Sequence, residues 1–100
     1  MDLSDQVVIV TGAGQGIGKA AALALADAGA DVVVVDINER TLAETAAAVK
    51  AKGRRTLAIR ADLGSVAEID RMVAESVAAF GRIDTLVNNA GVTRRAYIMD

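Results

Sequence analysis

The chain has 100 residues and a net charge of −2, with 11 Lys and Arg against 13 Asp and Glu. This length suits a single domain, and the 53% hydrophobic content is typical of a folded globular protein. The lack of Cys and His excludes disulfides, thiolate metal sites and His-dependent catalysis, while the acidic balance and 2% aromatic content argue against nucleic-acid binding.

Short β-branched runs alternate with Ala- and Leu-rich segments along the whole chain. Continuous apolar runs indicate buried strands, and apolar residues at a spacing of three to four indicate helices. In chain order, the pattern predicts a strand at 6–11, a helix at 17–28, a strand at 31–36, a helix at 39–52, a strand at 55–60, a helix at 66–80 and a strand at 83–88. The alternation predicts right-handed βαβ units, and therefore a parallel sheet with helices on both faces.

Each predicted helix carries a candidate apolar face and boundary signals. Asn38 is placed to cap the second helix, and Ser65 with Glu68 forms a capping-box pattern before the third. Glycines follow each helical pattern, where a left-handed residue often ends a helix. The expected core-facing residues are Ile17, Ala21, Leu25 and Ala28 in the first helix, Leu42, Ala46 and Val49 in the second, and Val66, Ile69, Val73, Val77 and Phe80 in the third.

The turn after the first predicted strand contains Gly12, Gly14, Gly16 and Gly18. Glycines let backbone N–H groups approach an anion closely, and the N-terminus of the following helix adds a partial positive charge. The loop therefore predicts a diphosphate-binding site, although a tight turn without a ligand is the plainer alternative. No apolar run has the roughly 20 residues of a membrane span, and acidic residues near the N-terminus do not suit a signal peptide. We expect a cytoplasmic protein without a membrane partner.

Known phosphate and nucleotide loops fit this turn unequally. A P-loop would need Gly where Ala13 stands and a hydroxyl where Ala20 stands. Residues 14–18 match the Gly-x-Gly-x-Gly of S-adenosylmethionine-dependent methyltransferases, but residues 11–12 lack the acidic residue usual before it. The methyltransferase alternative stays open on these residues.

Four motifs in order resemble the short-chain dehydrogenase/reductase family, and the resemblance covers essentially the whole chain. The first is Thr-Gly-x-x-x-Gly-x-Gly at residues 11–18, and each of the others follows one of the later predicted strands. These are Asp36, 18 residues after Gly18, then Asp62 with Leu63, and then Asn88-Asn89-Ala90-Gly91. The resemblance implies a Rossmann-type α/β fold with strand order 3-2-1-4, in which residues 1–100 are the N-terminal part of one NAD(P)-binding domain.

Within that family resemblance, the four motifs form one cofactor site at the carboxyl ends of the strands. The N–H groups of Gln15 and Ile17 would bind the diphosphate, and Asp36 would accept hydrogen bonds from a ribose diol. Each acidic residue could instead be a loop carboxylate, and residues 88–91 could be only a turn. The expected site is Gly12, Gly14, Gln15, Gly16, Ile17, Gly18, Asp36, Asp62, Leu63, Asn89, Ala90 and Gly91, without catalytic residues or metal ligands.

The resemblance implies an NAD(P)-dependent oxidoreductase that transfers hydride between nicotinamide and an alcohol or ketone. NAD is expected over NADP, because the Asp36 carboxylate would repel a 2′-phosphate and no Arg directly follows it. The family's catalytic Asn, Ser, Tyr and Lys lie beyond its fourth strand, so we expect this chain to be the cofactor-binding part of a longer enzyme and inactive alone. Tyr97 is then a substrate-side loop residue at most.

Other properties are implied by the same resemblance. The Asn-Asn-Ala-Gly-Val-Thr-Arg run looks most like the β-ketoacyl carrier-protein reductases and related NAD-dependent alcohol and sugar dehydrogenases. The whole enzyme would form a homo-oligomer, a dimer or tetramer, and act on a small molecule. A non-catalytic dinucleotide-binding module remains the alternative from a different functional class.

Overall fold

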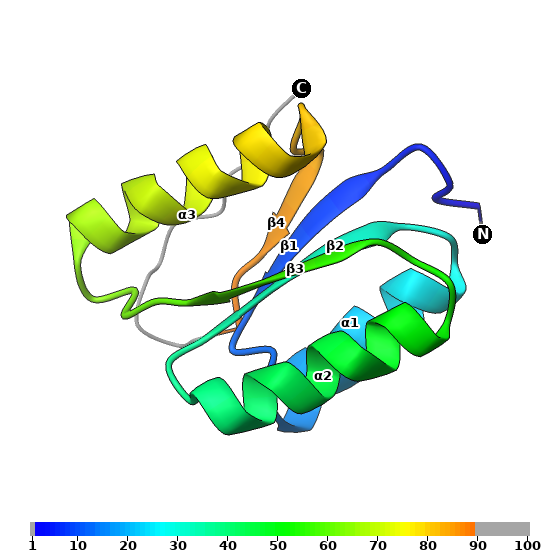
Figure 1. The fold of residues 1–100 in the computed structure, drawn as a ribbon, viewed down its shortest axis with the longest axis horizontal. Coiled ribbons are helices and arrows are strands. Elements are labelled where there is room, and N and C mark those ends of the chain that lie inside the picture. The colour runs from blue at the N-terminus through cyan, green and yellow to red at the C-terminus, as the bar shows by residue number, and fades with distance from the viewer. Residues whose placement is uncertain (1, 90–100) are drawn as a thin grey trace.

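A parallel sheet with strand order β3-β2-β1-β4 lies at the centre of the computed structural model, which describes residues 2–89 (Figure 1). Helices α1 and α2 cover one face of this sheet, and α3 covers the other. The elements are β1 (Val7–Thr11), α1 (Gly16–Asp27), β2 (Asp31–Asp36), α2 (Glu39–Ala51), β3 (Thr56–Arg60), α3 (Val66–Phe80) and β4 (Thr85–Val87). The expected Rossmann-type α/β class and strand order are confirmed.

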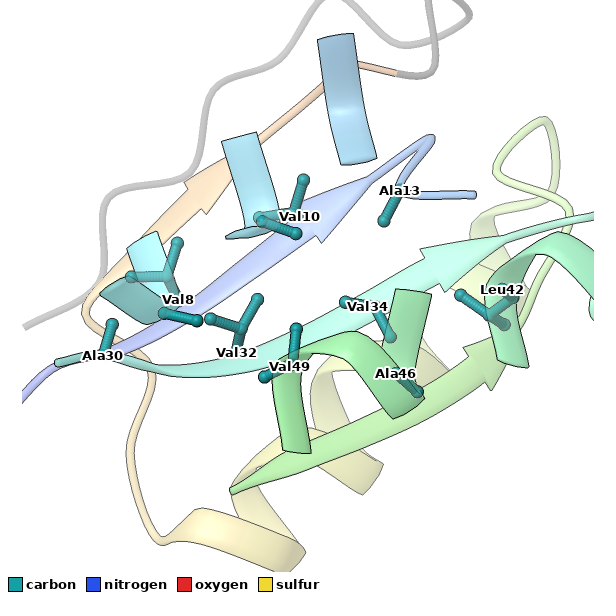
Figure 2. Close-up of a cluster of buried hydrophobic side chains, with 11 residues drawn as sticks. Val8, Val10, Ala13, Ala30, Val32, Val34, Leu42, Ala46 and Val49 are labelled. Atoms are coloured by element: carbon teal, nitrogen blue, oxygen red, sulfur yellow. The ribbon is translucent and has the colours of Figure 1, made fainter. Parts of the chain in front are cut away.

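The two central strands contribute to the core on both faces of the sheet. Side chains alternate between the faces of a strand, so a continuous valine run buries residues on both sides of the sheet. Val8 and Val10 of β1, with Val32 and Val34 of β2, face α1 and α2, where Ala46 and other small side chains meet them (Figure 2). The opposite face holds Val7, Ile9, Val33, Val35, Ile59, Ala61, Leu63, Met72 and Ile83.

Helix α1 packs on a different face from the one that its larger side chains indicate. Its buried residues are Gly18, Ala22 and Ala26, whereas Ile17 is 79% exposed. The smallest side chains recur every four residues and let the helix approach the sheet closely. Of the predicted face, Ala21 and Leu25 remain partly buried against the core.

Helix α3 also turns a narrower apolar face to the sheet than predicted. Met72 and Ser76 are buried, and Ile69, Val73 and Phe80 are partly buried against the core. Val66 and Val77 were expected in this stripe but are 73% and 42% exposed. Val66 lies at the first helical position, and Val77 lies beside Ser76, which takes the buried position instead.

The predicted caps of the second and third helices are confirmed. The Asn38 side chain accepts hydrogen bonds from the N–H groups of Arg40 and Thr41. The Ser65 hydroxyl accepts from the N–H of Glu68, but the Glu68 carboxylate does not return a bond to Ser65. It accepts from the Asp62 N–H at 3.4 Å and pairs with Arg71, which holds the pKa of Glu68 below its usual value.

The loops that carry the sequence motifs follow the carboxyl ends of the strands. The glycine turn follows β1, Asp36 ends β2, Asp62 follows β3, and Asn89 follows β4. Because all four strands are parallel, these positions lie at one edge of the sheet. In the part of the chain that the structure describes, no helix has both the length and the apolar character to cross a bilayer.

Candidate functional site

A cleft of about 460 Å³ opens at the carboxyl edge of the sheet. It brings together segments from the ends of all four strands. Its lining consists of Gly12, Gln15, Gly16, Ile17, Val35, Asp36, Ile37, Ala61, Asp62, Leu63 and Asn89. Eight of these residues are in the predicted site, whereas Val35, Ile37 and Ala61 are additional. Ala90 and Gly91 of the predicted site lie outside the described residues.

The glycine loop bends through two residues in the left-handed region. Gly12 has φ 62° and Gly16 has φ 60°, a conformation that glycine adopts at no steric cost. A Cβ atom at Gly16 would meet no atom within 4 Å, so this position faces open space in the cleft. The loop therefore presents bare backbone to whatever enters.

The N-terminus of α1 differs from the other two helix N-termini. Asn38 and Ser65 cap α2 and α3 with side-chain oxygens. At α1, the residue in the capping position is Gln15, which makes no such bond, and the first turn contains no acidic residue. Backbone N–H groups there are available to an anion, and the helix dipole adds a partial positive charge.

Asp36 is held at the edge of the cleft by two backbone donors. The Gly14 N–H donates to Asp36 Oδ2 at 2.8 Å, and the Asn38 N–H donates to Asp36 Oδ1 at 3.1 Å. A Cβ at Gly14 would collide with the side chains of Thr41 and Asp36. Gly14 therefore lies behind the carboxylate and does not line the cleft.

The charge of the cleft is negative at two points. Among its described lining residues, the ionisable ones are Asp36 and Asp62. Asp62 Oδ1 accepts from the Gly64 N–H at 2.9 Å, and Leu63 beside it is 6% exposed. Arg40 is the nearest cationic residue to Asp36 along the chain, but within residues 2–89 its exposed side chain forms no ion pair.

Two threonines outside the predicted site hold its loops in place. Thr11 Oγ accepts from the Asn89 N–H at 2.8 Å and lies 3.0 Å from Asn88 Oδ1, joining the ends of β1 and β4. Thr45 of α2 is fully buried and donates to the Ala13 carbonyl at 2.8 Å. The only sequence signal for Thr45 is a hydroxyl side chain within the apolar stripe of its helix.

Gly18 is expected to be essential for packing, so Gly18→Ala should destabilise the protein. Its Cβ would collide with the Gly12 carbonyl and lie 2.9 Å from Asn89 Nδ2. Alanine in a helix normally adds about 0.5–1 kcal/mol of stability, but overpacking here should cost about 1–3 kcal/mol. Chemical denaturation measures this loss. Gly64→Ala is the control, since its Cβ would approach only a carboxylate oxygen at 3.2 Å; equal stability of both variants would contradict the prediction.

Comparison with known proteins matches the chain to one family. The family model described as short chain dehydrogenase covers residues 6–100. A (2S)-[(R)-hydroxy(phenyl)methyl]succinyl-CoA dehydrogenase subunit from Thauera aromatica is 44% identical over 94 residues, which is 94% of this chain and 38% of that protein. Curated relatives of this kind are much longer than the chain, which spans 28% and 38% of two of them.

Solved structures agree with the family match. A short chain dehydrogenase from Mycobacterium paratuberculosis bound to NAD superposes with a TM-score of 0.86 and 35% identity, over 93% of this chain and 39% of that one. An NAD⁺-bound xylitol dehydrogenase gives a TM-score of 0.88 at 37% identity, over 91% of this chain and 35% of that one.

Proposed function

This chain belongs to the short-chain dehydrogenase family, and on that premise we propose that it is the N-terminal, dinucleotide-binding part of an NAD(P)-dependent oxidoreductase. The complete enzyme would transfer hydride between the nicotinamide and a small alcohol or ketone. Residues 1–100 would form part of a single cofactor-binding domain. The family match favours this function over the methyltransferase that the glycine spacing left open.

One observation carries the proposal: an uncapped helix N-terminus and bare glycine backbone lie in the same cleft as a fixed carboxylate. The N–H groups near Gln15 and Ile17 suit a diphosphate, because backbone donors and the helix dipole favour an anion there. The Asp36 carboxylate suits a ribose diol, since it accepts hydrogen bonds. The bound cofactor supplies the hydride chemistry through its nicotinamide ring, while these residues bind and orient it.

The other end of the cleft suits an adenine ring. Leu63, Ile37 and Ala61 supply apolar surface, and Asp62 supplies an acceptor that an exocyclic amino group can reach. Aromatic heterocycles bind in clefts lined mostly by apolar groups with a few polar ones. The family resemblance gives Asp62 and Leu63 the same role. Asn89, with Ala90 and Gly91 after it, would lie beneath the ribose.

We infer the substrate class, the assembly and the cellular location of the whole enzyme from its family alone. Its substrate would be a small molecule, its assembly a homo-oligomer, and its location the cytoplasm. A module that binds the dinucleotide without turnover is the competing function. A Tyr-x-x-x-Lys sequence downstream of Asp100 would favour the enzyme.

Binding titration with the purified complete protein tests the proposal directly. We expect NAD(H) to bind and S-adenosylmethionine to give no signal, with reduced-nicotinamide fluorescence and calorimetry as the two measurements. Binding of S-adenosylmethionine without NAD(H) would refute the proposed function.

The carboxylate of Asp36 should make NAD(H) bind more tightly than NADP(H). A 2′-phosphate carries about −1.5 to −2 charges, and its repulsion by a nearby carboxylate, reduced by solvent, is worth roughly 1–3 kcal/mol. This corresponds to about 5- to 150-fold in affinity. Asp36→Asn should lower the NAD(H)-to-NADP(H) affinity ratio by most of that factor, as measured by titrating both cofactors.

A matched variant separates this local charge effect from the general charge of the cleft. Asp62→Asn also removes one negative charge from the lining. Its contact would be with the adenine, which both cofactors share, so it should weaken both equally and leave the ratio unchanged. Equal or tighter binding of NADP(H) by the unmodified protein would refute the NAD(H) preference.

A further inference from the structure

The peptide group between Ala13 and Gly14 is held at both of its ends. Its carbonyl oxygen accepts a hydrogen bond from Thr45 Oγ at 2.8 Å, and its N–H donates to Asp36 Oδ2 at 2.8 Å. One rigid peptide plane therefore connects helix α2 to the carboxylate at the end of β2. The preceding N–H, that of Ala13, donates to the Val35 carbonyl at 3.0 Å.

The hydroxyl of Thr45 is unusual for a helical position. Buried Ser and Thr in helices commonly donate to the carbonyl four residues back, and Ser76 of α3 does so, at 2.7 Å from the Met72 oxygen. Thr45 has the same option at the Thr41 carbonyl, 3.2 Å away. Its shorter hydrogen bond is instead to the Ala13 carbonyl in the glycine loop, 32 residues earlier in the chain.

We propose that Thr45 is a positioning residue that sets the Asp36 carboxylate through the Ala13–Gly14 peptide, and thereby the discrimination between NAD(H) and NADP(H). The inference rests on the proposed function, because it concerns the cofactor of that site. Without the hydroxyl, the buried Ala13 carbonyl loses this hydrogen-bond donor, which is unfavourable. Rotation of the peptide group toward another donor would relieve that cost. Rotation removes the Gly14 N–H from Asp36 and, within the described residues, leaves the Asn38 N–H as the donor to the carboxylate.

Thr45→Val in the complete protein tests this, because valine keeps the branched shape and loses only the hydrogen bond. We expect NAD(H) affinity to fall about 3- to 10-fold, the effect typical of one hydrogen bond, and the NAD(H)-to-NADP(H) ratio to fall with it. Thr45→Ser should restore both. Ser76→Ala is the matched control, since it removes another fully buried hydroxyl and should lower stability without changing the ratio.

Hydrogen exchange at the Gly14 amide gives a second measurement, made without any cofactor. The amide should exchange faster in Thr45→Val than in the unmodified protein, and at an unchanged rate in Ser76→Ala. If Thr45→Val does not fold, Thr45→Cys carries the same comparison, because a thiol is a weak donor.

The outcomes separate the two claims. An unmodified protein that binds neither dinucleotide refutes the proposed function, and with it the role of Thr45 in selectivity. If NAD(H) binds, a Thr45→Val protein that loses stability but keeps both the cofactor ratio and the Gly14 exchange rate overturns the inference alone. A lowered ratio with faster Gly14 exchange and rescue by Thr45→Ser supports it.

Discussion

Gly16→Val is expected to weaken NAD(H) binding at least about 100-fold, the equivalent of about 2.7 kcal/mol. Gly16 lines the cleft, and a Cβ there meets no protein atom within 4 Å. The added side chain would project into the space where the diphosphate is proposed to meet the backbone. Titration of the complete protein with NAD(H) measures the loss.

The backbone of Gly16 adds a second effect that a control must remove. At φ 60° a β-branched residue is strained, by about 1–3 kcal/mol. Gly53 has φ 81° and also has nothing within 4 Å of a Cβ, but it lies after α2 at the opposite edge of the sheet. Gly53→Val should therefore lose similar stability and retain NAD(H) binding. Normal binding by a folded Gly16→Val protein would mean that the loop does not hold the diphosphate.

A polypeptide of these 100 residues alone is expected to show no hydride transfer. Reduction of a carbonyl needs a positioned acid to give the proton, and such a group contributes about 10²- to 10⁴-fold to the rate. The sequence has neither His nor Cys, and Tyr97 is its single Tyr. The cleft contributes Asp36 and Asp62, which the proposal assigns to the ribose and the adenine rather than to the reacting carbon.

Absorbance at the reduced-nicotinamide band measures this turnover with a panel of alcohols and ketones. The complete protein, prepared from the same host, is the positive control. Turnover by the 100-residue polypeptide at a rate near that of the complete protein would contradict the prediction, as would an active complete protein without Tyr-x-x-x-Lys.

The strands were predictable because their signal is strong and local. The valine run of β2 was predicted with its observed bounds, since a short, continuous β-branched run is typical of a strand buried on both faces. The fourth strand was predicted over 83–88 but forms the ladder only at Thr85–Val87. Beyond it, Asn88 and Asn89 bond to Thr11 instead of continuing the ladder.

The packing face of α1 was not predictable from hydrophobicity. The helix is so rich in alanine that several faces have similar apolar character, and the closeness of approach to the sheet decides among them. Gly18 shows this, because the absence of a side chain lets its backbone pack against the Gly12 carbonyl. Glycine is less hydrophobic than isoleucine, so hydrophobic periodicity favours the face that includes Ile17.

The loops of the site were predictable as motifs but not as a hydrogen-bonded arrangement. Thr11 belongs to the glycine-loop motif at residues 11–18, yet its hydrogen bond to Asn89 joins residues 78 positions apart. The contact from Thr45 to Ala13 spans 32 positions and belongs to no motif. Such pairings depend on how α2 packs against the sheet and how β4 pairs with β1, which local sequence does not encode.

The central place of β1 in the sheet has a consequence for the newly made chain. Its partner β2 follows closely, but its other edge pairs with β4, and the Val7 N–H bonds to Asp84, 77 residues later. At about 5–20 residues per second, the edge of β1 that pairs with β4 stays unpaired for about 4 to 15 s while the intervening residues are synthesised. Closing this loop costs about 1 kcal/mol more than closing the 24-residue one between β2 and β3. Within residues 2–89 the cleft, which needs Asn89, is therefore completed after β1, β2 and β3 have been synthesised.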